Sequence, residues 1–134
     1  MTPDNIKHRL KGAPIIMVVD DIEGVRTVIS MQLRTLGYRV IEAKGGLQAV
    51  ELIKREHPSL ILMDISMPGM DGLDAARMIR RTEGISDIPI IGLSAHYGEE
   101  MRDEALEAGC NEFATKPLEF KLLADLICQH LRSQ

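Results

Sequence analysis

The chain has 134 residues, of which 45% are hydrophobic, so it is long enough for one folded domain and short for two. It carries 16 basic and 20 acidic residues, a formal net charge of −4, and no Trp. This composition lacks the basic, aromatic-rich surface that nucleic acids need, so we expect no nucleic-acid partner. The longest apolar run, at 15–19, is far short of the ~20 residues that span a bilayer. We expect neither a membrane segment nor a signal peptide.

The two cysteines, Cys110 and Cys128, form neither a close-set metal-binding pair nor a disulfide framework. We expect both to pack as small apolar side chains, which favours a reducing, cytoplasmic setting. Residues 1–13 are polar and without pattern, so we interpret them as a loose N-terminal arm. The folded domain is predicted over 14–132.

Strand-like and helix-like segments alternate from residue 14 onward. Short apolar or β-branched runs predict five strands, at 15–19, 39–43, 60–63, 88–93 and 112–115. The last run is weak by itself, and its place in the alternation supports it. A regular alternation of apolar strands with helices predicts an α/β fold, with a parallel sheet covered on both faces.

Apolar residues at helical spacing predict five helices after these strands. The first two span 23–36 and 47–56, and the third and fourth lie around 73–79 and 101–108. The last has one apolar side and a second stripe beside it. The side consists of Leu118, Leu122, Leu126 and His130, and the stripe consists of Leu123, Ile127 and Leu131.

Sites in such folds form where the carboxyl ends of parallel strands meet, so the residues that follow each strand matter most. Asp20 and Asp21 follow the first strand. Two interpretations are equally supported: the two residues cap the next helix, or they bind a hard cation such as Mg²⁺. Asp64 follows the third strand, and a loop with Pro and two Gly comes after it. Asp64 is therefore badly placed to cap a helix, and we favour a site.

Ser94 follows the fourth strand and Lys116 the fifth. Ser94 alone indicates no more than a cap or a turn. Lys116 is predicted to meet three carboxylates that would repel each other without a counter-charge. A lone carboxylate such as Asp64 can act as a nucleophile toward a phosphoryl group, and a cation and Lys116 would neutralise the oxygens of that group.

Four stretches together resemble the receiver domain of two-component response regulators, of the chemotaxis-regulator type. They are IMVVDD at 16–21, LMDISMPGMDG at 62–72, IIGLSA at 90–95 and AGCNEFATKPL at 108–118. The resemblance covers about residues 14–132, and the combination of motifs is highly specific. It implies a doubly wound, flavodoxin-like (βα)5 fold with five parallel strands in the order 2-1-3-4-5.

The resemblance also implies roles for particular residues. Asp64 would be the phosphoacceptor, and Ser94 and Lys116 would bind the phosphoryl group. Ser94 and Phe113 would form the conformational switch. Mg²⁺ would be the cofactor, held by Asp20, Asp21, Asp64 and the main-chain carbonyl of Ser66.

Other details follow from the same resemblance. Ser66 and His96 would tune the lifetime of the phosphorylated state, and the Lys116–Pro117 peptide bond would be cis. Many receivers have Thr in place of Ser94 and Tyr in place of Phe113. Ser keeps the hydroxyl, whereas Phe lacks one, so the switch here would depend on ring packing alone.

The function implied is that of a phosphoprotein in a two-component phosphorelay, not of an enzyme with a separate substrate. It would catalyse only its own phosphorylation and dephosphorylation. Its partners would be a histidine kinase or phosphotransfer protein and an unidentified downstream protein, as a monomer or a phosphorylation-dependent dimer. The signal would appear on the face formed by the fourth helix, the strand at 112–115 and the last helix. The chain would be a stand-alone regulator or part of a hybrid kinase or longer regulator.

Three other functions fit less well. A phosphohydrolase of the haloacid dehalogenase type would have Asp-x-Asp at the first strand and a cap domain. Here the acids are adjacent and the candidate nucleophile follows the third strand. A flavodoxin-type module would need a Ser/Thr-rich phosphate loop and aromatic residues against the flavin. A degenerate receiver that serves only for docking is disfavoured by the intact acidic residues.

Overall fold

The computed structural model describes residues 12–66, 72–95 and 98–132. Within these ranges, five parallel strands form one sheet in the order β2-β1-β3-β4-β5, as predicted. The strands are β1 (Ile15–Val19), β2 (Arg39–Ala43), β3 (Leu60–Asp64), β4 (Ile90–Ser94) and β5 (Glu112–Thr115). The helices are α2 (Glu23–Thr35), α3 (Gly46–Glu56), α4 (Gly72–Arg81), α5 (Glu99–Ala108) and α6 (Phe120–Arg132).

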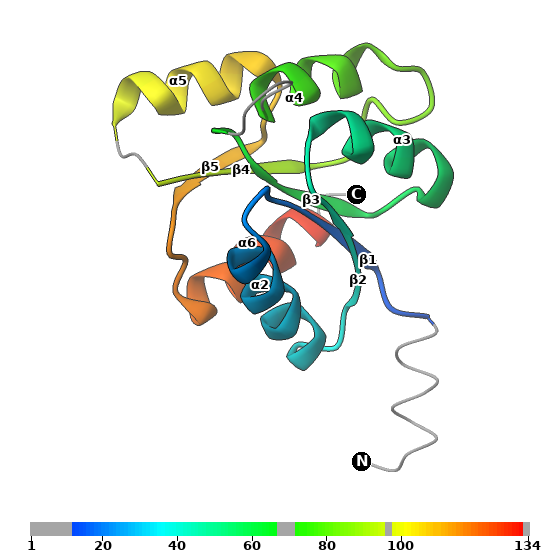
Figure 1. Cartoon of the computed structure of the whole chain (residues 1–134), viewed down its shortest axis with the longest axis vertical. Coiled ribbons are helices and arrows are strands. Elements are labelled where there is room, and N and C mark those ends of the chain that lie inside the picture. Colours follow the sequence, from blue (N-terminus) through cyan, green and yellow to red (C-terminus); the bar gives the residue numbers. More distant parts are fainter. Residues whose placement is uncertain (1–11, 67–71, 96–97, 133–134) are drawn as a thin grey trace.

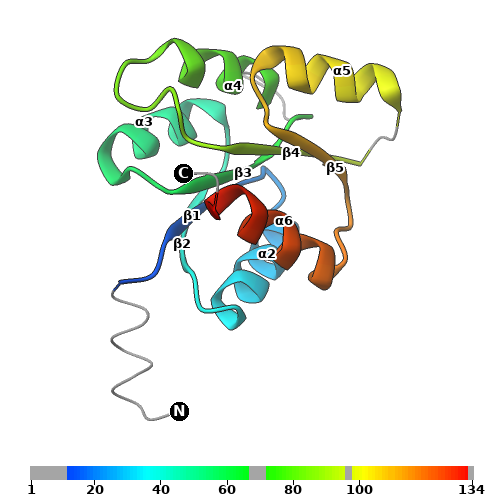
Figure 2. The ribbon, with the colours of Figure 1, turned by 180° about the vertical axis from the view of Figure 1, so that it is seen from behind.

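Helices cover both faces of the sheet. Helices α3, α4 and α5 lie on one face, and α2 and α6 lie side by side on the other (Figures 1 and 2). Alternate residues of each strand therefore enter different cores. In β1, Met17 and Val19 pack on the α3–α5 side, whereas Ile16 and Val18 pack on the α2 and α6 side. Burial on both faces explains why the central strands are continuous apolar runs.

Two strands end later than the sequence indicated. Strand β3 includes Asp64, which pairs with Leu93, and β4 includes Ser94, which pairs with Thr115. The start of β4 was predicted two residues too early, at 88. Pro89 has no N–H, so it cannot donate a hydrogen bond to a neighbouring strand. Its carbonyl still accepts the N–H of Ile61 at 2.9 Å. Asp64 and Ser94 are thus fixed by sheet pairing.

The structure shows which faces of α6 and α3 are buried. In α6, Leu123 and Ile127 are buried, whereas Leu122 is 47% exposed, so the core stripe is the second one. Leu47 was expected in the core, but it lies in the first turn of α3 and is 62% exposed. Helix α6 is apolar around much of its circumference, and the spacing alone did not decide which stripe faces the sheet.

The cysteine prediction is right for Cys110 and wrong for Cys128. Both are free thiols, but only Cys110 is buried, and burial raises its pKa to about 11. Cys128 follows the buried Ile127 on α6, and a step of about 100° turns it outward. In the part of the chain that the structure describes, no helix is long and apolar enough to cross a membrane.

Arg80 joins several elements at the edge of the sheet opposite Asp64. From the end of α4, its guanidinium donates to the carbonyls of Gly109 (2.9 Å), Ser86 (2.8 Å) and Ile88 (2.7 Å). It also donates to Asn111 Oδ1 at 2.7 Å, and the N–H of Ile90 donates to the same oxygen at 2.9 Å. One half-buried side chain therefore fixes the ends of α4 and α5 to the starts of β4 and β5.

We predict that Arg80→Met lowers the free energy of unfolding by about 2 kcal/mol or more, because several acceptors lose a charged donor in a region shielded from water. Urea unfolding measures this. Arg81→Met is the matched control, since Arg81 is the next residue of α4 and is exposed. Equal effects of the two substitutions would contradict the structural role of Arg80.

Candidate functional site

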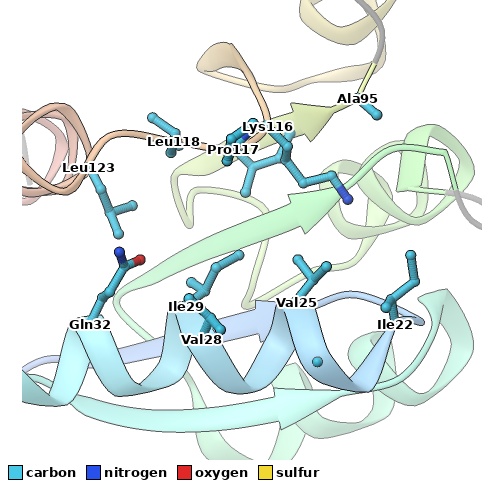
Figure 3. A pocket seen from close by; sticks show the side chains of 12 residues that line it. Ile22, Val25, Val28, Ile29, Gln32, Ala95, Lys116, Pro117, Leu118 and Leu123 are labelled. Atoms are coloured by element: carbon cyan, nitrogen blue, oxygen red, sulfur yellow. The ribbon is translucent and has the colours of Figure 1, made fainter.

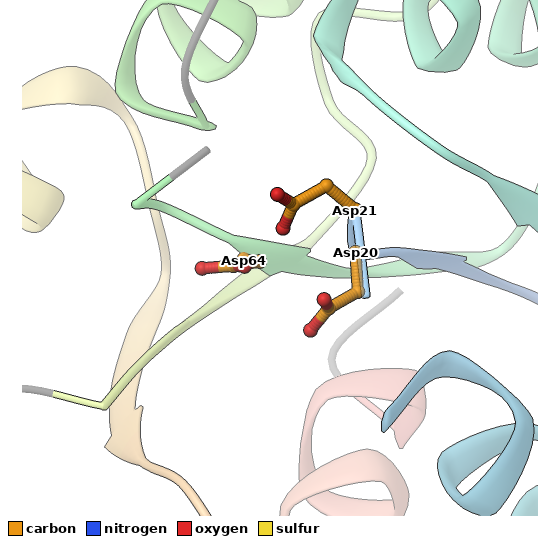
Figure 4. A group of neighbouring side chains, drawn as sticks. All are labelled: Asp20, Asp21 and Asp64. Carbon is orange, nitrogen blue, oxygen red and sulfur yellow. The ribbon is translucent and has the colours of Figure 1, made fainter. Parts of the chain in front are cut away.

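Three carboxylates meet where β1 and β3 end (Figure 4). Oxygen atoms of Asp20, Asp21 and Asp64 all lie within 4.8 Å of one another. Asp20 is 1% exposed and Asp64 3%, whereas Asp21 is exposed to solvent. Convergent carboxylate oxygens with one open side are the ligand set that a hard cation such as Mg²⁺ prefers. The residues present therefore fit such a cation.

The capping interpretation of Asp20 and Asp21 is wrong. Helix α2 has Ile22 as its N-cap residue, without a side-chain capping bond. Asp20 Oδ1 instead accepts the N–H of Ile22 itself at 2.9 Å, and the main-chain N–H of Asp20 donates to Ala43 at 3.1 Å. These bonds hold the turn after β1 rather than the first turn of the helix.

Lys116 supplies the counter-charge that the sequence predicted. Its Nζ lies 3.1 Å from Asp20 Oδ2 and 3.4 Å from Asp64 Oδ2. Burial lowers the pKa of Lys116, but the hydrogen bond to Asp20 and the negative charges of Asp64 and Asp20 outweigh burial, so the pKa is raised overall. Lys116 is therefore a charged ammonium. The Lys116–Pro117 peptide bond is cis, as predicted.

Asp64 has a raised pKa, chiefly because it is buried. The N–H of Ser66, 3.0 Å from Oδ1, and the charge of Lys116 act in the opposite direction, and the charge of Asp20 adds to the increase. The folded protein thus holds Asp64 in an environment that disfavours its negative charge. Any group that neutralises this carboxylate is correspondingly favoured.

Two hydroxyls complete the site. Ser94 is fully buried at the end of β4, and its Oγ lies 3.5 Å from Ser66 Oγ. The carbonyl of Ser94 accepts the N–H of Lys116 at 2.8 Å, which ties the ends of β4 and β5 together. The structure therefore brings Ser66, Ser94 and Lys116 to the same edge of the sheet as the three carboxylates.

Phe113 is partly buried and packs against the core on the α3–α5 side, in register with Gly92 of β4. A Cβ added to Gly92 would lie 3.1 Å from Ile65 Cγ2 and 3.2 Å from Cys110 Sγ, so the space beside Phe113 is tightly filled. His96 lies outside the described residues.

An apolar groove opens beside this site (Figure 3). Its volume is about 520 Å³. One wall is α2 and the residues before it, and the other is the connection from β5 to α6, with Lys116 at its edge (Figure 3). The most exposed of its large apolar residues are Ile22 (54%) and Val28 (56%).

Sequence reasoning did not assign roles to two residues at the site. Gly72 begins α4, and a Cβ there would collide with the main-chain oxygen of Asp64 and lie 2.5 Å from Ile65 Cα. Arg26 is buried on α2 and donates to the main-chain oxygen of Asp20 at 2.9 Å. A signal for Arg26 was present: it shares the i, i+4, i+7 spacing of the buried residues Ser30 and Leu33.

The family model of the response regulator receiver domain matches residues 16–128. The chain is 41% identical over 118 residues to hybrid signal transduction histidine kinase M of Dictyostelium discoideum, covering 84% of the chain and 5% of the kinase. It spans less than half the length of such curated relatives.

Two solved structures are similar over nearly the whole chain. One is a putative response regulator from Chloroflexus aurantiacus, with a TM-score of 0.86 and 28% identity, covering 90% of this chain and 98% of that one. The other is the receiver domain of sensor histidine kinase PA1611 from Pseudomonas aeruginosa, crystallised with a magnesium ion in its active site cleft. Its TM-score is 0.83 and its identity 36%, with coverage of 90% and 98%.

The chain therefore belongs to the response regulator receiver domain family, a class of signalling phosphoacceptors in two-component systems. This result agrees with the resemblance seen in the motifs. Membership of this family argues against the phosphohydrolase and flavodoxin-type alternatives.

We predict that Gly72→Ala lowers the free energy of unfolding by about 1–3 kcal/mol, because a backbone contact cannot yield as a flexible side chain can. It should also displace Asp64 and weaken cation binding. Gly24→Ala is the control, since Gly24 lies in α2 with nothing within 4 Å of an added Cβ. Because Gly24 lies in the first turn of α2, that substitution should leave the free energy of unfolding unchanged or raise it slightly. Urea unfolding of both variants decides the matter, and a neutral Gly72→Ala would refute the close packing.

Proposed function

We propose that the protein receives a phosphoryl group on Asp64 from a histidine kinase or a phosphotransfer protein, in the presence of Mg²⁺. The observation that carries the proposal is the buried Asp64 carboxylate, with Lys116 Nζ 3.4 Å away and the oxygens of Asp20 and Asp21 beside it. Charge on a transferred phosphoryl group spreads over three oxygens, and catalysis consists mainly of positioning and of neutralising that charge.

In the proposed reaction, an Asp64 oxygen attacks phosphorus, the phosphorus–nitrogen bond to the donor histidine breaks, and the histidine leaves with the bonding electron pair. Lys116 remains beside the new acyl phosphate and offsets its charge. The Ser94 hydroxyl, held at the end of β4, donates a hydrogen bond to a phosphoryl oxygen. Mg²⁺ would be held by Asp20, Asp21, Asp64 and the main-chain carbonyl of Ser66, and would neutralise further negative charge.

The donor protein must present its histidine at the open side of the carboxylate cluster. The apolar groove begins next to Lys116 and continues along α2, where Ile22 and Val28 are exposed (Figure 3). We infer that the donor docks along this groove, since exposed apolar side chains beside the carboxylate cluster can be buried against apolar side chains of the donor.

The output of phosphorylation is proposed on the face formed by α5, β5 and α6. A phosphoryl group gives the Ser94 hydroxyl a charged acceptor, and movement of Ser94 toward it would pull on β4 and on Phe113 beside it. Full burial of a Phe side chain is worth roughly 1.5–3 kcal/mol. Because Phe113 is already partly buried, only part of that gain is available. The switch therefore requires two states of nearly equal energy.

Further parts of the proposal rest on the same site. Ser66 lies beside Ser94, where its hydroxyl can guide or block the water that hydrolyses the acyl phosphate, and His96 is proposed to act with it. We infer a cytoplasmic setting, which the two free thiols support. The receiver unit is proposed to span 14–132, as a monomer or a phosphorylation-dependent dimer. The same chemistry would serve a stand-alone regulator or a receiver within a longer protein.

We predict that acetyl phosphate with Mg²⁺ adds one phosphoryl group, read as a mass increase of the intact protein. Asp64→Asn should abolish the modification because the nucleophile is lost, and chelation of Mg²⁺ should abolish it in the wild type. Asp103→Asn, at an exposed position of α5, is the control and should be modified normally. A normal mass increase in Asp64→Asn or without metal would refute the proposal.

The proposed switch predicts that beryllofluoride, a phosphoryl mimic, shifts backbone NMR signals in α5, β5 and α6 as well as around Asp64. In Ser94→Ala the distant shifts should disappear, whereas Ser94→Thr should keep them because the hydroxyl remains. Distant shifts that persist in Ser94→Ala would show that the signal does not pass through this hydroxyl.

A further inference from the structure

Arg26 places a buried guanidinium directly behind the carboxylate cluster. Its side chain is 9% exposed and its Nη1 donates to the main-chain oxygen of Asp20 at 2.9 Å. Its Nε donates to Glu42 Oε1 on β2 at 3.0 Å. A buried charge is costly unless it is paired and hydrogen-bonded, and Arg26 meets both conditions through Glu42 and Asp20.

These contacts fix the peptide that links Asp20 to Asp21. The N–H of Asp20 donates to Ala43, and its carbonyl accepts from Arg26, which is itself anchored on Glu42. Glu42 and Ala43 are neighbours on β2, so one strand holds Asp20 at both ends. The main-chain N–H of Arg26 donates to the carbonyl of Ile22, which is the first hydrogen bond of helix α2. The direction in which Asp21 leaves this peptide is therefore set from β2.

Arg26 cannot assist cation binding through its charge. A positive charge close to a divalent cation site repels the cation, so by Coulomb's law alone Arg26 weakens cation binding. The contribution of Arg26 to such a site must then be geometric: it holds two carboxylates in a position to converge.

We propose that Arg26, anchored by Glu42, is a positioning residue that aligns Asp20 and Asp21 for Mg²⁺. The inference rests on the proposed function, since it assigns Mg²⁺ to this cluster. Partners that orient ligands of a metal site typically change metal affinity by 10–100-fold when they are lost. Arg26→Gln should accordingly weaken Mg²⁺ binding about tenfold. Loss of a repelling positive charge alone would instead strengthen Mg²⁺ binding.

The experiment is a titration of the full chain with MgCl₂, followed by backbone amide chemical shifts. Arg34→Gln is the matched control, because Arg34 also lies on α2 and approaches Glu42 (3.8 Å to Oε2) but is 54% exposed. Both variants lose one positive charge, so bulk electrostatics affects them in the same direction. Arg34→Gln should bind Mg²⁺ as tightly as the wild type or slightly more tightly.

Two more variants test the geometry itself. Arg26→Lys keeps the charge but cannot reach Glu42 and the Asp20 carbonyl together, so its binding should weaken as in Arg26→Gln. It also keeps the test valid if Arg26→Gln fails to fold, which the dispersion of the amide spectrum reveals. Adding Glu42→Gln to Arg26→Gln should cause little further loss, because both residues act through one contact.

Unchanged or tighter Mg²⁺ binding in folded Arg26→Gln or Arg26→Lys would overturn the inference and leave the proposed function intact. Equal weakening in Arg34→Gln would also overturn it, because charge would then be the cause. A wild type that does not bind Mg²⁺ would refute the proposed function together with this inference.

Discussion

One ammonium facing two buried carboxylates is the interaction on which the site depends. Lys116 contributes a single positive charge where Asp20, Asp21 and Asp64 contribute three negative ones. Lys116 reduces the repulsion among the carboxylates, but the cluster keeps a net negative charge. A divalent cation would supply the missing positive charge. Without one, the contacts with the protein do not neutralise the charge of Asp64. The parallel sheet makes the arrangement possible, because its strands end at one edge.

The two ends of the sheet differ in how firmly their strands are joined. At the amino ends of β4 and β5, Arg80 and Asn111 bind each other and several main-chain groups. At the carboxyl ends, Ser94 and Lys116 share one main-chain bond, and their side chains face the carboxylate cluster. A phosphoryl group on Asp64 would act on the second end only. Under the proposed function, the fixed end would confine the response to the carboxyl ends of the strands and the loops that follow them.

The sequence was sufficient for what depends on local pattern. Short apolar runs that alternate with segments of helical spacing predicted the α/β class, and residues at the strand ends predicted Asp20, Asp64 and Lys116 as neighbours. The sequence was insufficient where the role of a residue depends on a contact with a distant part of the chain. The collision that requires Gly72 exists only because α4 begins against the end of β3. The role of Arg26 depends on Glu42, sixteen residues away on β2. The apolar stripes of α6 could not be ranked without knowing how the helix lies on the sheet.

The raised pKa of Asp64 shows that the negative charge of this carboxylate costs the fold stability. With that pKa raised, the folded protein binds a proton more readily than the unfolded chain does. The stability of the fold therefore falls as pH rises from the ordinary range of an Asp toward the raised pKa, and it stays lowered above that pKa. Above the raised pKa, the carboxylate is ionised at a cost to the fold. A ligand that offsets this charge and binds only the folded state gains affinity from the same cost. A neutral residue at position 64 would remove this cost and, with it, one of the three carboxylates of the cluster. Buried charges that lower the stability of a fold are common at functional sites, and Asp64 has this character.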